Sequence, residues 1–351
     1  MRFAFTEEQL ELARVTRELL ARACPPTAVR AAWETAPDVP PAWKELAAAG
    51  IVGMTAPERF GGAGANELDL ALVLEEAGRA ALPAPLVDHT AVAIPLIVEA
   101  CGDAMLDRLL AGALTGAGIL AVQLAGAPLV EGAQRARTIL IERDGDLLAI
   151  DARSATLEPH RSVDRSRALA RITWAQGAQG SQAPRGAGTT TALARAFDRG
   201  AFATAAVLIG LGRRMIEMTV DYAGLRKQFD RPIGSFQAVK HALAEAHVAL
   251  ELARPCVHRA AYALAHREPT ATRDVSLAKA LASDAATLTA RTALQCHGAI
   301  GYSFEHDLHL WMKRAWALAA SYGSAAFHRN RLAASILDST GTSPPPPGRS
   351  P

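Results

Sequence analysis

Apolar residues in the first third of the chain follow a helical period. From about residue 10 they recur every three to four positions, which predicts an amphipathic helix. Thr6 and Gln9 form a capping box that predicts where this helix begins, and Asn66 is placed to cap a later helix. Further helical patterns cover residues 41–49, 66–78 and 89–110. We therefore predict a helical N-terminal domain over residues 1–112.

The pattern changes at about residue 113. Short apolar or alternating runs, separated by turn-like sequence, occupy residues 119–124, 136–142, 147–151 and 169–174. Runs of this length are typical of strands, and their close spacing predicts a small middle antiparallel β domain over residues 113–188.

From residue 189 the helical period returns in long, alanine-rich segments. These segments cover residues 191–225, 235–266, 270–297 and 322–338. Long helices joined by short turns are typical of a four-helix bundle, which we predict over residues 189–338. The proline-rich residues 339–351 are predicted to be a disordered tail. The predicted fold class is a multidomain α+β protein, and 351 residues suffice for two or three domains.

Composition narrows the possible functions. The net charge is only +2, so neither nucleic acid nor an acidic membrane is expected as a partner. The four cysteines are far apart and form no CxxC pair, which indicates reduced thiols in a cytoplasm. No signal peptide and no run of about 18 apolar residues is found, so we expect a soluble cytoplasmic protein. His297 has no second His or acid at ligand spacing immediately around it, and no metal site is expected.

Three segments carry motifs in a specific order. The first is APERFGGAG at 56–64 with EEAGR at 75–79, the second is RKQFDRPIGSFQ at 226–237, and the third is QCHGAIGY at 295–302 with KRA at 313–315. In this order and at these separations they resemble the acyl-CoA dehydrogenases, over about residues 3–337. The resemblance extends to the shortened subunits of heteromeric enzymes that act on CoA thioesters of steroid side chains in actinobacteria.

The resemblance implies a site for the adenosine diphosphate half of FAD, reaching across a subunit interface to a neighbour's flavin. Arg226 offers a planar fork suited to a diphosphate, and Phe229 can lie against an adenine. Gln295 can donate to phosphate oxygens, and Gly298, which has no side chain, lets the backbone come close to the ligand. Ala299 follows in the same motif.

The family's catalytic base, a Glu that removes the α proton of the thioester, is missing at both places where members carry it. One place falls at Gly323, or between Tyr322 and Gly323, and residues 308–337 hold no Asp or Glu. The other place falls at Gly200. Asp198 is the nearest acid there, but two residues along a helix turn it about 200° from the needed face. We therefore assign no catalytic residue.

The β domain also lacks the hydroxyl and acid with which the family grips the flavin ring, since residues 122–128 read VQLAGAP. We expect an FAD-dependent subunit of a heteromeric acyl-CoA dehydrogenase, such as an α2β2 assembly, that desaturates a CoA thioester. In it this chain contributes the adenine and diphosphate half of an FAD shared with a catalytic partner subunit. The resemblance implies an electron-transferring flavoprotein as electron acceptor.

Two alternatives remain open. One is a self-sufficient homotetrameric acyl-CoA dehydrogenase whose base is Asp198 or a residue brought in by oligomerisation. The other is a non-catalytic descendant that only binds flavin or a partner protein.

Overall fold

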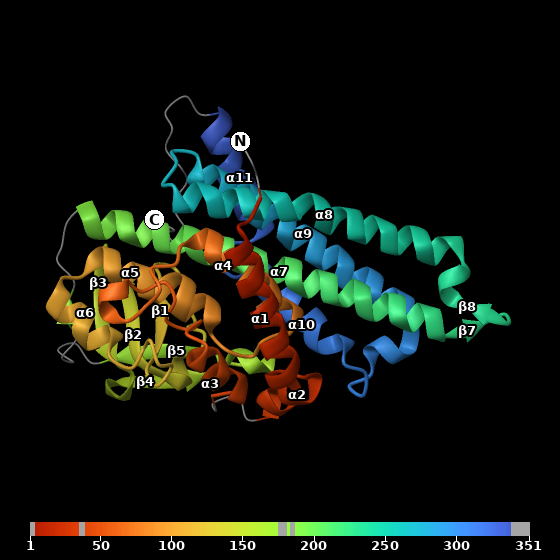
Figure 1. The fold of residues 1–351 in the computed structure, drawn as a ribbon, viewed down its shortest axis with the longest axis horizontal. Helices are drawn as coiled ribbons and strands as arrows, with labels where there is room; N and C mark the ends of the chain where they lie inside the picture. The colour runs from red at the N-terminus through yellow and green to blue at the C-terminus, as the bar shows by residue number, and fades with distance from the viewer. Residues whose placement is uncertain (1–3, 35–38, 175–180, 183–186, 338–351) are drawn as a thin grey trace. The chain divides into compact units, whose positions relative to one another are not determined.

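The computed structural model describes residues 4–34, 39–174, 181–182 and 187–337 (Figure 1). The chain divides into two compact units. One unit comprises the described parts of 1–21, 71–82 and 204–343, and the other comprises those of 22–70 and 83–203. This division follows compactness, so the boundaries proposed from sequence at 112, 188 and 338 stay predictions. The predicted tail at 339–351 lies outside the described residues.

The capping residues read from the sequence begin two helices, α1 (Glu7–Ala23) and α4 (Glu67–Arg79). At α1 the Thr6 N–H donates to Gln9 Oε1 (3.0 Å) and the Gln9 N–H donates to Thr6 Oγ1 (3.2 Å), which confirms the capping box. At α4 the Asn66 side chain accepts from the Leu68 N–H at 2.8 Å. Between them lie α2 (Pro26–Glu34), α3 (Pro41–Ala48) and the short 3₁₀ helix η1 (Glu58–Phe60).

The helical pattern at 89–110 proves to be three elements. They are the π-helical turn η2 (Val87–Ala93), α5 (Ile94–Ala100) and α6 (Asp103–Leu110). Pro95 lacks an N–H and stands at the start of α5, while Gly102 separates α5 from α6. The η2 turn holds His89, whose Nδ1 accepts from the Leu120 N–H (2.9 Å) and whose Nε2 donates to the Ala113 carbonyl (3.2 Å). Burial lowers the pKa of His89 to about 4, so the ring stays neutral.

The middle of the chain forms two small sheets. One has the order β1 (Ile119–Gln123), β2 (Ala136–Arg143), β3 (Asp146–Asp151), β6 (Ser181–Gln182), and the other pairs β4 (Ala155–Pro159) with β5 (Ala170–Trp174). Pairing is antiparallel as predicted, except that β1 and β2 run parallel. The connection over residues 124–135 is long enough for the crossover that a parallel pair needs. A buried apolar cluster packs on the sheets: Ala121, Val130, Ala133, Ile139, Ile141, Ile150, Ala152, Ala170 and Ile172.

Long helices form the C-terminal bundle, as predicted. They are α7 (Ala187–Leu225), α8 (Gln237–Ala265), α9 (Ala271–His297), α10 (Leu308–Ala320) and α11 (Ala325–Leu337). Helix α9 packs against α8, α10 and α11. The periodicity had indicated the fourth helix at 322–338, where α11 lies, and had left α10 unassigned. Figure 1 shows α8 and α9 running alongside each other, with a hairpin of β7 (Lys227–Gln228) and β8 (Arg231–Pro232) where α7 gives way to α8.

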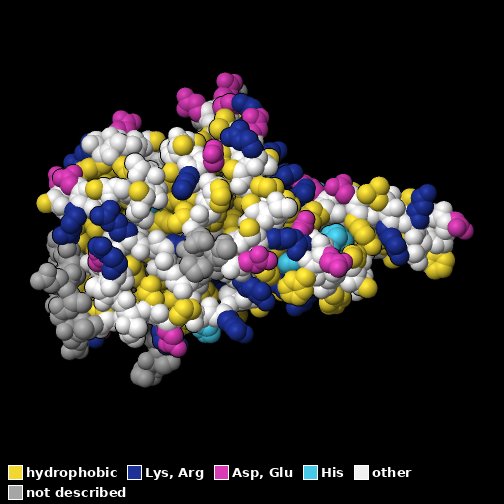
Figure 2. All heavy atoms as spheres, turned by 90° about the horizontal axis from the view of Figure 1, so that it is seen from below, with side chains coloured by type: hydrophobic (Ala, Val, Ile, Leu, Met, Phe, Trp, Pro, Cys, Tyr) yellow, Lys and Arg dark blue, Asp and Glu magenta, His cyan; other side chains and the backbone are white. Residues whose placement is uncertain are grey.

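The surface carries charges of both signs. Figure 2 shows Lys and Arg side chains intermingled with Asp and Glu over the visible face, in keeping with the small net charge. Within the described part of the chain, no helix combines the length and apolar character needed to cross a membrane.

Helices α4 and α7 touch through their backbones. A Cβ atom on Gly210 would lie 1.9 Å from the Glu75 carbonyl oxygen, and one on Gly78 would lie 2.1 Å from the Val207 carbonyl oxygen. Real side chains never come this close, so only glycine permits the crossing. The glycine of the EEAGR segment is therefore a packing residue.

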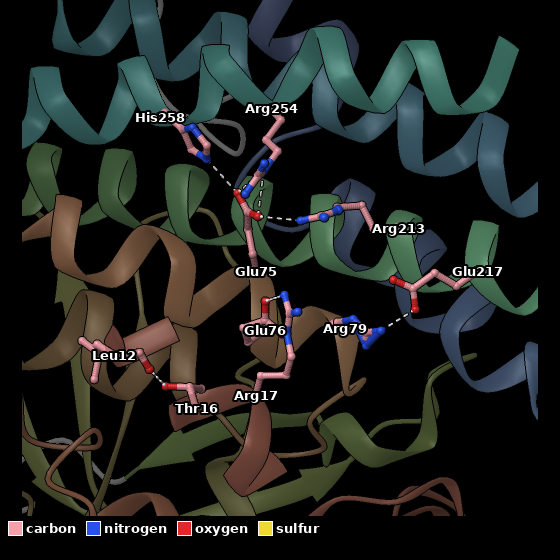
Figure 3. Close-up of polar contacts among 10 residues, drawn as sticks. All are labelled: Leu12, Thr16, Arg17, Glu75, Glu76, Arg79, Arg213, Glu217, Arg254 and His258. Atoms are coloured by element: carbon pink, nitrogen blue, oxygen red, sulfur yellow. Dashed lines mark hydrogen bonds and ion pairs between the residues drawn. The ribbon is translucent and has the colours of Figure 1, made fainter. Parts of the chain in front are cut away.

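The acids of the same segment tie helices together. Figure 3 shows the buried Glu75 carboxylate facing Arg213 of α7 together with Arg254 and His258 of α8. The distances from Glu75 are 3.5 Å to Arg213, 2.9 Å to Arg254 and 2.8 Å to His258. Two further ion pairs at 2.6 Å extend the network: Glu76 with Arg17 of α1, and Arg79 with Glu217 of α7. These ion pairs connect α1, α4, α7 and α8 to one another.

Candidate functional site

The second motif forms a tight hairpin after α7. Strands β7 (Lys227–Gln228) and β8 (Arg231–Pro232) are joined by Phe229 and Asp230, whose φ angles are 52° and 61°. Two consecutive left-handed residues are what a two-residue type I′ hairpin turn requires. The Ile233 N–H donates to the Arg226 carbonyl at 2.8 Å and closes the base of the hairpin. Phe229, at the tip, has 87% of its surface exposed.

All five predicted cofactor-binding residues are solvent-exposed. The side chains of Arg226 and Gln295 make no hydrogen bond or ion pair with the described residues, so both are available to a ligand. Gly298 caps α9 with a φ of 63°, and nothing lies within 4 Å of the position a Cβ would take. Ala299 follows it in η7 (Gly298–Tyr302).

Tyr222 joins the second motif to the third. Its ring stacks on His297 with a centroid distance of 4.4 Å and an interplanar angle of 18°. Its carbonyl accepts from the Arg226 N–H at 2.8 Å, and His297 immediately precedes Gly298. The structure therefore brings the two motifs, about 70 residues apart in sequence, to the same end of the bundle.

The turn between α10 and α11 contains the position where the resemblance places the base. Tyr322 and Gly323 both have positive φ angles, 52° and 97°. A Cβ atom on Gly323 would lie 2.5 Å from Phe327 Cδ1 and 2.8 Å from His328 Nε2. In this conformation position 323 has no room for any side chain.

Two buried residues hold this turn. The Lys279 ammonium donates to the Ala319 carbonyl (3.0 Å), the Gly323 carbonyl (3.1 Å) and the Ser283 hydroxyl (3.0 Å). Burial lowers the pKa of Lys279 to about 7. Lys279 carries no motif in the sequence, and its one local signal is that it is the only charged residue in the largely apolar run at 275–282.

His328 holds the other side of the turn. Its Nε2 donates to the Tyr322 carbonyl at 2.8 Å and its Nδ1 accepts from the Ser276 hydroxyl at 3.3 Å. Burial lowers the pKa of His328 to about 3, so the ring is neutral and both bonds require the same tautomer. This residue, too, was missed in the sequence.

The second possible base position lies inside α7. Gly200 and Asp198 are both buried. The intervening Arg199 is held by two carboxylates, donating to Glu67 at 2.6 Å and to Glu99 at 2.7 Å. This segment of α7 is therefore part of the packed interior of its unit.

The turn after β1 uses its donors internally. The Gln123 side chain donates to the Ala127 carbonyl at 2.9 Å, and the Ala125 N–H donates to the Glu142 carboxylate at 2.9 Å. A turn satisfied in this way offers neither group to a flavin ring. Among the described residues no cluster of three or more His, Cys, Asp and Glu side chains could hold a metal ion.

Two parts of the chain match sequence models of one family. The model of the acyl-CoA dehydrogenase N-terminal domain matches residues 6–117, and that of the acyl-CoA dehydrogenase C-terminal domain matches residues 186–337. The acyl-CoA dehydrogenase IpdE2 of Mycolicibacterium smegmatis is 34% identical over 338 residues, covering 94% of this chain and 99% of that protein. This chain belongs to the acyl-CoA dehydrogenase family.

Solved structures share the fold. A variant of the Tcur3481–Tcur3483 steroid ACAD superimposes with a TM-score of 0.85 at 26% identity, covering 96% of this chain and 99% of that one. The ChsE4–ChsE5 complex from Mycobacterium tuberculosis superimposes with a TM-score of 0.86 at 23% identity, covering 97% and 100%. The order of helical domain, small β region and helical bundle predicted from sequence is therefore the acyl-CoA dehydrogenase fold.

FAD is the cofactor of acyl-CoA dehydrogenases, which are oxidoreductases. The exposed cationic fork of Arg226, the ring of Phe229 and the amide of Gln295 suit an adenosine diphosphate group. In the turn after β1 the Gln123 side chain and the Ala125 N–H already have partners, and the turn at Gly323 has no room for a Cβ atom.

Proposed function

We propose that this chain is the base-lacking subunit of a heteromeric acyl-CoA dehydrogenase. It contributes Arg226, Phe229, Gln295, Gly298 and Ala299 to an FAD whose isoalloxazine ring lies in a partner subunit. The reaction is the α,β-desaturation of a CoA thioester. The observation that carries the proposal is a contrast within one unit: the groups suited to a dinucleotide are open to solvent, while the position of the family's base is filled.

The same end of the bundle offers a surface for the partner. Four large apolar side chains near the hairpin and η7 are exposed: Leu225 by 82%, Phe229 by 87%, Tyr302 by 75% and Phe304 by 56%. Exposed aromatic and apolar groups of this kind, next to an arginine, are typical of protein interfaces. A partner subunit that covers them also encloses the cofactor.

Relatives support pairing of two related chains. The steroid ACAD that this chain resembles at 26% identity is named by two components, Tcur3481 and Tcur3483, and ChsE4–ChsE5 is a complex. By analogy we propose a bulky, steroid-type acyl-CoA as substrate and an electron-transferring flavoprotein as acceptor. These two assignments rest on likeness alone.

The residues of this chain bind and orient, and they do no chemistry of their own. FAD, when bound, accepts the hydride from the β carbon of the substrate. Arg226 would neutralise part of the charge of the diphosphate, Gln295 would donate to its oxygens, and Phe229 would cover the adenine, which would anchor the flavin for aligned transfer. The α proton goes to a base that the α10–α11 turn of this chain does not supply.

The test is flavin content. The chain is purified alone and after co-expression with a second acyl-CoA-dehydrogenase-like subunit, and bound FAD per chain is measured by absorbance. We expect little flavin alone and a yellow complex with the partner. Arg226→Ala should remove most of the flavin from the complex, whereas Arg153→Ala, which removes an exposed arginine paired with Asp151, should not.

The alternatives give different results. A homomer that binds FAD stoichiometrically and oxidises an acyl-CoA at normal turnover would favour the self-sufficient enzyme. A yellow complex that oxidises no acyl-CoA would favour the non-catalytic descendant.

A further inference from the structure

We propose that Tyr222 is a positioning residue for the dinucleotide, because with His297 it fixes the separation between two groups of binding residues. We call these groups the clasp: its first half is Arg226 and Phe229, and its second half is Gln295, Gly298 and Ala299. The inference rests on the proposed function, since it concerns how this chain holds FAD. Tyr222 itself is one helical turn before Arg226 and lies outside both halves.

The link is a cluster of three rings. Tyr222 and His297 lie face to face at 4.4 Å, and His306 stands edge-on to both, with centroids 4.7 Å from His297 and 6.2 Å from Tyr222. The Tyr222 hydroxyl also donates to the His297 carbonyl at 3.4 Å. The last turn of α7 is thereby fixed to the end of α9.

His297 provides a rigid, neutral surface for this stack. Only 3% of its surface is exposed, and burial lowers the pKa of its ring. Its Nδ1 donates to the Ala293 carbonyl at 2.8 Å, which leaves Nε2 unprotonated and without a hydrogen-bond partner among the described residues. The ring therefore acts through its face, and its orientation is set by α9 itself.

Each half of the clasp is attached directly to one member of the stack. The Arg226 N–H donates to the Tyr222 carbonyl, and the hairpin that carries Phe229 begins at the next residue. On the other side, Gln295 is the second residue before His297 and Gly298 is the first after it. A ligand that is held by two groups of residues binds less tightly when those groups can move relative to each other. Binding must then also fix their separation, and this loss of conformational freedom reduces the affinity.

The stack can be removed without touching the clasp. Tyr222→Leu and His297→Leu each remove one of the two stacked rings. Tyr222→Phe keeps the ring and loses only the hydrogen bond from the hydroxyl to the His297 carbonyl. Tyr262→Leu is a matched control, because Tyr262 stacks on His266 at 3.9 Å and 22° near the opposite end of α8.

The experiment measures the FAD dissociation constant of the heteromeric complex by flavin fluorescence, with the thermal midpoint of each variant alongside. We expect Tyr222→Leu and His297→Leu each to raise the dissociation constant about tenfold, and the double variant to add little more. The dissociation constant of Tyr222→Phe should stay within about twofold of that of the unsubstituted complex. That of Tyr262→Leu should be unchanged, although this variant loses a comparable ring stack.

Two results would overturn the positioning role. One is a Tyr222→Leu complex that binds FAD as tightly as the unsubstituted complex. The other is an equal loss of FAD affinity in Tyr262→Leu, which would show that general destabilisation is the cause. Failure of the proposed function is recognised separately, because the unsubstituted complex would then hold no FAD. In that case the positioning role fails with it.

Discussion

A Cβ atom on Gly323 would lie 2.5 Å from Cδ1 of Phe327, and that contact closes the position where the sequence resemblance places the family's base. The φ angle of 97° also disfavours a side chain at this position, independently of the contact. The carbonyl of the same residue accepts from Lys279, which holds the turn in place. Packing and backbone conformation together therefore disfavour a side chain at position 323.

Gly323→Ala should lower the free energy of unfolding by about 3 kcal/mol, since left-handed strain and overpacking against Phe327 add up. Gly145→Ala is the control, because Gly145 has a φ of 81° and nothing within 4 Å of its Cβ position. The control should lose only about 1–2 kcal/mol for the backbone conformation. Denaturant unfolding of both variants measures the difference.

A double variant tests the cause of that difference. Gly323→Ala combined with Phe327→Ala should recover part of the loss, because the smaller side chain leaves room for the added methyl group. Equal losses in Gly323→Ala and Gly145→Ala would contradict the packing account and leave position 323 open to a side chain.

Stability should rise with pH above neutrality because of Lys279. Its pKa is about 7 in the folded protein, against 10.5 for an unperturbed lysine, so the unfolded chain binds more protons between these values. Folding releases a proton there, and the free energy of unfolding increases by up to about 1.4 kcal/mol per pH unit. Denaturant unfolding of the natural protein and of Lys279→Met at about pH 7, about pH 8 and about pH 9 measures this slope.

Lys279→Met should remove this part of the pH dependence, because methionine keeps most of the volume and has no proton to release. Lys240→Met, which removes a solvent-exposed lysine, is the matched control. Identical slopes in the natural protein and in Lys279→Met would show that the buried amine does not titrate in this range.

Glu75→Gln should destabilise the helical bundle by about 3 kcal/mol, because two arginines and a histidine lose their shared buried carboxylate. The matched control is Glu11→Gln, which removes an exposed partner of Arg14 and should leave the free energy of unfolding nearly unchanged, because solvent screens surface ion pairs. Equal effects of the two substitutions would mean that the Glu75 network is not a structural centre of the fold.

Asp198→Asn should leave turnover of the heteromeric complex within about twofold, whereas removing a true general base costs about 10²-fold or more. Asp198 is buried beside the Arg199 ion pairs, so thermal unfolding is measured as well to separate stability from chemistry. A large loss of turnover with an unchanged thermal midpoint would support Asp198 as the base and the self-sufficient enzyme.

The sequence predicted correctly those elements that depend on residues close together in the chain. The Thr6–Gln9 capping box is a contact between residues three apart, and the periodicity of the long bundle helices is likewise local. It did not predict elements that depend on pairing with a distant segment. Strand β4 (Ala155–Pro159) carries little apolar pattern and forms by pairing with β5, and the parallel pairing of β1 with β2 depends on the path of the connection.

The order of the domains and the lack of any acid between 308 and 337 were determined by the sequence alone, because composition and local periodicity survive in any conformation. The clasp residues were proposed from the resemblance of their motifs to the family. The closing of position 323 and the Tyr222–His297 stack were decided only by the tertiary structure. Lys279 meets the Gly323 carbonyl across 44 residues, and Tyr222 meets His297 across 75. Contacts at such separations depend on how helices pack against one another, which no local pattern records.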